Sequence, residues 1–276
     1  MPGGGAGGEL GLGGRGDAGG LNILAGDAAL LRGTKYILTL DADTRLLPGS
    51  ARELIGAMLH PMNAPVFDKN RVVVSGHGLI HPRMDVELPS AVKTPFSRVM
   101  AGSGGTDPYG ASCGEVWMDL TDRGGFAGKG ILNVDALLRG CSDLPENLIL
   151  SHDAIEGAIL RGGYMSDTEL TDGFPSNPGA YFRRQHRWVR GDWQNIGFIF
   201  KRGRNFAFAD RWKLFDSLRR SLFAPFCLAA LIWALAVPAA AALCAGLLAL
   251  PSLCTGVLPA LGTALLRRDP DPTGAL

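Results

Sequence analysis

The sequence predicts an α/β domain followed by membrane helices, and two observations lead to this fold class. First, short apolar runs of strand-forming residues alternate with stretches of helical periodicity over the first 220 residues, a pattern typical of α/β folds. Second, charge almost disappears after Arg220, because the only charged residues beyond it are Arg267, Arg268, Asp269 and Asp271. We therefore expect a water-exposed part first and a lipid-embedded part after it.

Composition narrows the classes of function. The chain has 276 residues, enough for one domain of ordinary size with additional segments. Its net charge is +1 and no basic stripe is present, so we expect no nucleic-acid partner. Its five cysteines form no CxxC pair, which argues against a disulfide framework or a zinc site. Residues 1–29 are glycine-rich, lack the features of an export signal and are expected to be disordered.

The first expected elements surround an acidic turn. Residues 36–40 (YILTL) read as a buried strand that ends at the polar residues 41–44 (DADT). The preceding residues 21–33 are compatible with a short helix. Pro48 is expected to open a helix with apolar residues at helical spacing, and residues 71–74 are a second strand candidate.

The middle of the chain is expected to alternate between irregular and regular structure. Residues 81–114 are rich in Gly, Pro and Ser and predict a long ordered loop. Residues 126–130 (FAGKG) predict a tight turn before a new element at 131–138. The remaining patterns are a helix over 151–162 capped by Ser151 and ended by Gly162 and Gly163, a strand over 164–170 and a long helix over 179–200.

The C-terminal part predicts a membrane association. Residues 207–220 are amphipathic and suit a helix lying in the membrane interface, although a helix packed on a soluble core has the same pattern. Residues 221–266 carry no charge and suit two spans broken near Pro238 or Pro251, the alternative being a buried helical pair. Arginines on both sides predict that both ends, including the tail 267–276, are cytoplasmic. The apolar residues expected on one face of the interface helix are Phe208, Trp212, Leu214, Phe215 and Leu218.

Two polar motifs lie where the expected elements meet. Asp41 and Asp43, one residue apart after a buried strand, can share a divalent cation that also holds phosphate oxygens, although such pairs also cap ordinary loops. Gly128 and Lys129 lie in the FAGKG turn, whose glycines allow backbone to approach a ligand, although a plain turn has the same composition.

A third motif begins the helix predicted from residue 151. Asp153 follows His152 there, and Glu156 lies one turn on. A carboxylate at this place can take a proton from an acceptor hydroxyl. The alternative is the ordinary preference for acidic residues at a helix N-terminus, which also favours the ionised form of Asp153.

The long helix over 179–200 carries an unusual density of arginine and tryptophan. Guanidinium groups hold diphosphates through forked hydrogen bonds, and indole rings offer flat faces for a sugar. A basic helix facing the membrane is the alternative. The candidate donor- or acceptor-binding residues on it are Arg184, Gln185, Arg187, Trp188, Arg190, Asp192 and Trp193.

The order of these motifs, followed by membrane helices, resembles the membrane-bound processive glycosyltransferases of the GT-A fold, such as cellulose synthases. The sequence of the motifs is more similar to one branch, the cyclic β-1,2-glucan synthases, from about residue 30 to residue 225. The stretches that carry the resemblance are YILTLDADTRL, HPMNAP, DPYGAS, FAGKGILNVDA, PENLILSHDAIEG, RRQHRWVRGDWQ and RWKLFDSLRRSLFAP.

The resemblance implies an inverting transfer of glucose from UDP-glucose to a β-1,2-glucan, with a divalent metal (Mg²⁺ or Mn²⁺), at the inner membrane of a bacterium. In that family's pattern Asp41 and Asp43 match the metal-binding pair and Asp153 matches the catalytic base. Arg187 and Trp188 match the end of the Gln-x-x-Arg-Trp motif. Arg184 stands where that motif has Gln. The cyclic-glucan branch also has a basic residue at this position, so the departure fits that branch.

The resemblance also implies that the chain is incomplete, with a partial GT-A domain over 30–206. The first nucleotide-binding strands would precede Tyr36, and the missing parts of the same synthase are then expected partners. Two rival interpretations stay open: another processive β-glycan synthase of the cellulose-synthase type, and a membrane fragment without catalytic activity.

Overall fold

The computed structural model describes seven stretches of the chain, and the expectations for residues 1–29 and 253–276 fall outside them. By its contacts the chain divides into two compact units, Met1–Leu218 and Arg219–Leu276. The described stretches are residues 31–101, 110–111, 114–145, 149–150, 152–200, 206–237 and 241–252.

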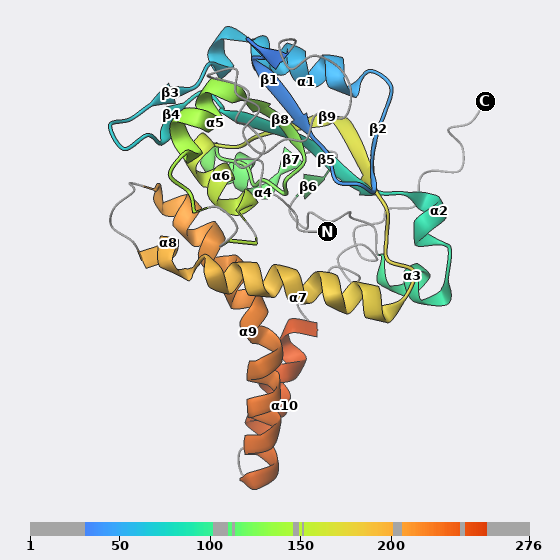
Figure 1. Ribbon diagram of the computed structural model, residues 1–276. Helices are drawn as coiled ribbons and strands as arrows, with labels where there is room; N and C mark the ends of the chain where they lie inside the picture. Colours follow the sequence, from blue (N-terminus) through green and yellow to red (C-terminus); the bar gives the residue numbers. More distant parts are fainter. Residues whose placement is uncertain are drawn as a thin grey trace, which may run out of the picture. The chain divides into compact units, whose positions relative to one another are not determined.

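A five-stranded mixed sheet organises the first unit, which confirms the α/β class (Figure 1). Only the pair β5–β9 is parallel; the other neighbours are antiparallel. The strands in sheet order are β1 (Tyr36–Thr39), β8 (Gly130–Asn133), β5 (Leu79–Val86), β9 (Gly163–Asp172) and β2 (Thr44–Leu46).

Helices cover both faces of this sheet because consecutive strand residues point to opposite sides. On one face Leu54 of α1 (Ser50–Leu59) packs with Ile80 and Ile131. On the other face Leu79 and Leu132, the neighbours of those two isoleucines, pack into a larger cluster. That cluster is completed by α5 (Val134–Cys141) and α6 (Asp153–Leu160).

The prediction of a long loop over residues 81–114 is wrong. Its start belongs to β5, the central strand, and the register against β9 shifts between Pro82 and Arg83. A bulge is one of the few places where a sheet accepts proline, which has no N–H to donate. The rest of the segment forms α2 (Leu88–Ala91), α3 (Pro95–Met100) and the two-stranded sheet of β6 (Gly110–Ala111) and β7 (Gly114–Glu115), after which comes α4 (Val116–Thr121).

Other elements differ from expectation mainly at their ends. The predicted strand over 71–74 is β4 (Val73–Ser75), which pairs with β3 (Val66–Phe67) after the short helix η2 (Pro61–Asn63). The predicted strand over 164–170 is confirmed within β9. The helix expected over 151–162 is the shorter α6, whose last turn is closed by Arg161 in a left-handed conformation (φ 53°) rather than by glycine.

The long helix expected over 179–200 is two helices. α7 (Pro178–Gln194) begins where the Asn177 side chain accepts a hydrogen bond from the backbone N–H of Ala180. It ends at Asn195, and α8 (Ile196–Phe200) follows.

A single helix, α9 (Phe208–Ala236), runs through the expected boundary at residue 220 and through Pro225. It is long and apolar enough to cross a membrane, and no second helix of the described residues meets that condition. α10 (Ala241–Ser252) extends through Pro251 to the last described residue, and Pro238 lies outside the described residues, so the break near either proline stays a prediction.

The predicted apolar face of residues 207–220 is divided between two environments. Leu214 and Leu218 are buried in the main core, whereas Phe208, Trp212 and Phe215 are exposed and their rings contact one another in sequence. The first turns of α9 therefore pack on the domain with one side and present aromatic rings on another.

A buried ion-pair group fixes the start of α9 to the domain. Asp210 is fully buried, 2.7 Å from Nε of Arg123 and 3.0 Å from Nζ of Lys213. Arg123 also donates to the carbonyl of Ala158 in α6, and Lys213 donates to the carbonyl of Gly124. These bonds connect α9 to the segment that leads into β8.

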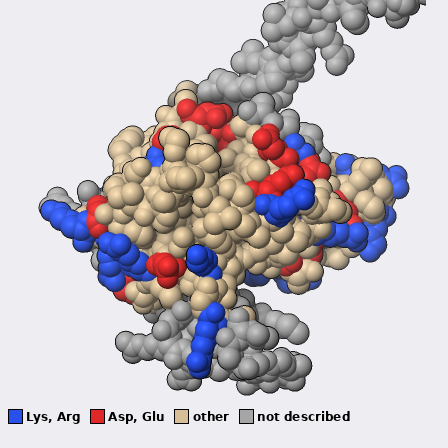
Figure 2. Space-filling model, turned by 90° about the horizontal axis from the view of Figure 1, so that it is seen from above, with Lys and Arg blue, Asp and Glu red and all other residues tan. Residues whose placement is uncertain are grey.

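Among the described residues, the face seen from above shows no extended patch of one charge (Figure 2). Residues other than Lys, Arg, Asp and Glu form the broad middle of this face, and acidic and basic side chains lie around it.

Candidate functional site

The candidate site lies at one edge of the sheet. β1, β5 and β9 run in the same direction and β8 runs against them, so the carboxyl ends of three strands meet the start of the fourth. Asp41 and Asp43 follow β1, Lys129 precedes β8, and Asp172 ends β9. The topology therefore brings to one edge two motifs that are separated by almost ninety residues in the sequence.

Lys129 is the centre of this edge. Its ammonium lies 2.7 Å from Asp172 and 3.0 Å from Asp41, and its side chain is 6% exposed. Burial acts to lower the pKa of Lys129, but the two carboxylates outweigh burial and raise it, so the group stays charged. Thr44 donates to the other oxygen of Asp172 at 2.6 Å. The FAGKG turn is therefore linked by charge to the acidic turn.

Glycine is required where this turn enters the sheet. Gly130 has φ 150°, and a Cβ atom there would lie 2.5 Å from the carbonyl oxygen of Ile80, closer than a nonbonded contact allows. The close backbone approach keeps Lys129 at the sheet edge.

Sequence reasoning did not single out Asp172. A signal was available, because Asp172 comes two residues after the predicted strand over 164–170 and is followed by glycine, which resembles the arrangement of an acid after a strand that drew attention to Asp41.

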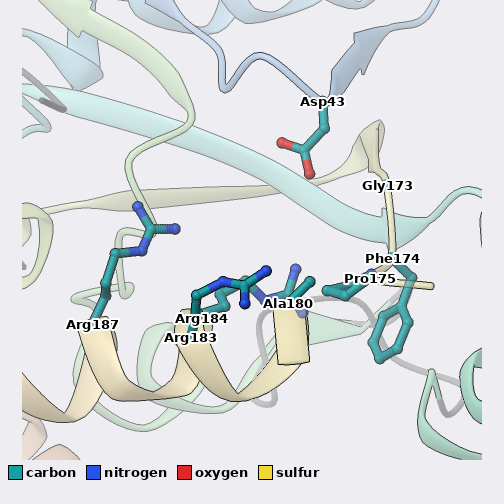
Figure 3. Close-up of a pocket in the computed structure, with 8 residues that line it drawn as sticks. All are labelled: Asp43, Gly173, Phe174, Pro175, Ala180, Arg183, Arg184 and Arg187. Carbon is teal, nitrogen blue, oxygen red and sulfur yellow. The ribbon is translucent and has the colours of Figure 1, made fainter. Parts of the chain in front are cut away.

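Asp43 faces a hollow of about 540 Å³ on the other side of the acidic turn (Figure 3). Arginines of α7 line the opposite side, so a carboxylate and several guanidinium groups border one space. No hydrogen bond or ion pair to the Asp43 carboxylate occurs within the described stretches. The residues around the hollow are Asp43, Gly173, Phe174, Pro175, Ala180, Arg183, Arg184 and Arg187.

Arg184 is held by two aromatic rings. Its guanidinium carbon lies 5.5 Å from the ring centre of Phe174 and 4.9 Å from that of Trp188, both distances at which a cation is attracted to a ring. Burial lowers the pKa of Arg184, while Asp43 and Asp172 act to raise it. The Trp188 ring therefore contacts the Arg184 guanidinium, which leaves this ring only partly available as a face for a sugar.

The remaining candidates of α7 lie elsewhere. Gln185 is half-buried but does not line the hollow. Arg190, Asp192 and Trp193 follow farther along the helix and do not line it either, with Trp193 46% exposed. Their predicted binding roles remain predictions.

Asp153 is packed against the FAGKG turn. Gly128 adopts φ 80°, and a Cβ atom there would lie 3.1 Å from an Asp153 carboxylate oxygen. Asp153 is the first residue of α6, and about a third of its side chain (32%) is exposed. The predicted cap Ser151 lies outside the described residues, and His152 takes the N-cap position.

His152 lies between two carboxylates. Its Nδ1 is 3.2 Å from an oxygen of Asp153 and 3.2 Å from an oxygen of Glu156. The side chain of Glu156 is only 3% exposed, although acids in the first turn of a helix are usually exposed. The ligand atoms of the three residues lie within 4.8 Å of one another, as in a metal site. The imidazole nitrogen itself lies beside both acids, so the arrangement is a close contact of one imidazole with two carboxylates.

The pKa of Asp153 is raised to about 6, first by burial and then by the like charges of Glu156 and Asp41, against the opposing effect of His152 and Lys129. The sequence predicts that the helix N-terminus favours the ionised form of Asp153, but burial outweighs that effect and raises the pKa. A carboxyl with a pKa near 6 is mostly ionised at pH 7 and accepts a proton more readily than an ordinary aspartate.

Fold and site together define an α/β protein whose sheet edge carries paired carboxylates, a buried lysine and a row of arginines. No known family model matches the chain. The sequence is 38% identical over 204 residues, 73% of this chain, to cyclic beta-(1,2)-glucan synthase NdvB of Rhizobium meliloti (strain 1021). The chain spans 7% of the length of that protein. This finding confirms the resemblance to the cyclic β-1,2-glucan synthases.

Proposed function

We propose that this chain is part of a glucosyltransferase that transfers glucose from UDP-glucose to a growing β-1,2-glucan. The observation that carries the proposal is a coincidence of two results. The similarity to NdvB covers 73% of the chain. Of the residues that the family pattern singles out, Asp43 and Arg187 border one hollow, and Asp153 packs against the FAGKG turn, whose Lys129 pairs with Asp41.

The donor diphosphate is assigned to the hollow between Asp43 and α7. Arg184 and Arg187 supply cationic donors suited to phosphate oxygens. A divalent cation (Mg²⁺ or Mn²⁺) fits beside Asp43, because its carboxylate is exposed and oxygen ligands suit such ions. When bound, the cation would neutralise charge on the leaving diphosphate. Asp41 is a weaker ligand candidate, because Lys129 already lies 3.0 Å from it.

The acceptor is assigned to the side of Asp153. In an inverting transfer the acceptor hydroxyl attacks the anomeric carbon as UDP leaves, and its proton passes to a base. Asp153 has the features of such a base, namely a partly exposed carboxylate, a pKa of about 6 and close packing against the FAGKG turn. Lys129 and Asp172 hold that turn and the acidic turn together.

The location is proposed to be the bacterial inner membrane, with the α/β part on the cytoplasmic side where nucleotide sugars occur. Support comes from α9, the one helix among the described residues that meets the length and apolarity of a span.

The proposal is tested by a chimera in which this chain replaces the matching region of NdvB. Membranes with the chimera are expected to incorporate glucose from UDP-glucose into 1,2-linked glucan when Mg²⁺ or Mn²⁺ is present. A chimera that is inserted and binds UDP but transfers no glucose contradicts the proposal. The 276-residue chain alone supplies a second measurement, because it is expected to bind UDP more weakly after Arg187→Ala.

A further inference from the structure

We propose that His152 is a positioning residue for Asp153, held in place by the buried carboxylate of Glu156. The inference rests on the proposed function in so far as Asp153 is the base. It assigns distinct tasks to three neighbouring residues: Asp153 contacts the acceptor, His152 orients Asp153, and Glu156 anchors His152.

One imidazole nitrogen lies close to two acids. A single imidazole nitrogen, Nδ1, lies 3.2 Å from Asp153 and 3.2 Å from Glu156. Rotation of the Asp153 side chain away from His152 would separate the carboxylate from Nδ1, so this contact favours the observed orientation of Asp153. Asp153 is limited on its other side by the FAGKG turn at Gly128.

Burial separates the roles of the two acids. The side chain of Glu156 is 3% exposed and lies on the buried side of α6, so a glucan hydroxyl does not reach it. Its second oxygen, Oε2, has no hydrogen-bond partner among the described residues. A buried carboxylate in this position needs a cation, and His152 is the group that reaches it. Asp153 keeps 32% of its side chain exposed and is the acid that a substrate can touch.

Electrostatics agrees with this geometry. The Glu156 carboxylate, at hydrogen-bonding distance, raises the pKa of His152 above its ordinary value, although burial acts to lower it. The imidazolium in turn lowers the pKa of Asp153, which burial, Glu156 and Asp41 raise. The groups that face Asp153 are thus His152 and Glu156 from its own helix, Asp41 from the acidic turn and Lys129 from the turn before β8.

Removing His152 should therefore leave Asp153 protonated over a wider pH range. An opposite charge within 4–6 Å shifts a carboxyl pKa by one unit or more, so His152→Gln is expected to move the Asp153 midpoint up by about one unit from about 6. Through this pKa shift, turnover of the NdvB chimera should fall about fivefold at pH 6, and this part of the loss should disappear above about pH 8, while the KM for UDP-glucose changes little.

Two measurements decide the matter. The first is the pH profile of kcat for His152→Gln beside the unchanged chimera. The control is His60→Gln, since His60 is the exposed N-cap residue before the short helix η2. The second needs no activity: carbodiimide labels protonated carboxyls, so mass spectrometry of the 276-residue chain gives the pH of half-maximal labelling at Asp153. An upward shift for His152→Gln and none for His60→Gln is the expected result.

The outcomes separate this inference from the proposed function. If neither the labelling midpoint nor the acid limb of kcat moves in His152→Gln, the positioning role is wrong, whatever Asp153 does. If the labelling midpoint moves but Asp153→Asn keeps full turnover, the coupling of the two side chains stands, whereas Asp153 as the base, and with it the positioning role in transfer, is overturned.

Discussion

At the scale of single residues, the two aspartates of the acidic turn have different surroundings and therefore different expected roles. Asp41 is paired with Lys129, whereas Asp43 faces the hollow that arginines of α7 border. Asp43→Asn in the NdvB chimera should lower glucose transfer roughly a thousandfold or more, because it removes a charged metal ligand that stabilises the leaving group.

The measurement is transfer at saturating Mn²⁺ with UDP-glucose. Asp68→Asn is a suitable control, since Asp68 caps a turn between β3 and β4 through its own backbone neighbours. Near-normal transfer by Asp43→Asn would contradict a metal-binding role and would favour the interpretation of the acidic turn as an ordinary loop.

Lys129 is expected to act mainly through charge balance. Lys129→Met leaves the buried Asp172 without its cation and should lower the free energy of unfolding by about 3 kcal/mol. The double variant Lys129→Met/Asp172→Asn should recover most of that loss, because no uncompensated buried charge remains. Denaturant unfolding of the chain in detergent gives both values, and a double variant as unstable as the sum of the single ones would refute a direct pairing.

At the scale of elements, the close approach of β8 to β5 predicts an asymmetry between two glycines. Gly130→Ala should destabilise the chain by several kcal/mol, because the new Cβ atom meets the backbone of β5. Gly56→Ala, in the exposed interior of α1 with open space around it, should stabilise by about 0.5–1 kcal/mol. The midpoints of thermal unfolding test this, and equal effects at the two positions would contradict the described packing.

Sequence patterns predicted most of the elements that have clear periodicity or clear end signals. The strand before the acidic turn, α1, β9 and α7 follow from such patterns. The central strand β5 could not be predicted, because its sequence LIHPRMDV contains proline and charges that are tolerated only through a bulge in a long-range pairing.

The candidate site was predictable as a set of residue types but not as a set of partners. The pairing of Lys129 with Asp172 joins the turn before β8 to the end of β9, and such contacts are fixed by sheet order rather than by local sequence. The burial of Glu156 was likewise missed, because an acid in the first turn of a helix is usually exposed.

At the scale of the whole molecule, topology in the membrane is the open structural prediction. The uncharged residues 221–266 with arginines on both sides predict a hairpin with both ends in the cytoplasm. A reporter fused after Leu276 should be active in its cytoplasmic form only. Since α9 is the one described helix that meets the criteria for a span, a periplasmic reporter signal would favour a single span and refute the hairpin.

The central claim is that this domain transfers glucose with Asp153 as the base, and separate measurement of UDP affinity and turnover tests it most directly. In the NdvB chimera, Asp153→Asn is expected to lower kcat about a hundred- to ten-thousandfold and to leave UDP affinity almost unchanged, because the base acts only when the hydroxyl attacks. Glu156→Gln, which leaves the Asp153 carboxylate itself unchanged, should retain much more activity. A loss of UDP binding as severe as the loss of turnover in Asp153→Asn, or a loss of transfer in Glu156→Gln alone, would contradict the account.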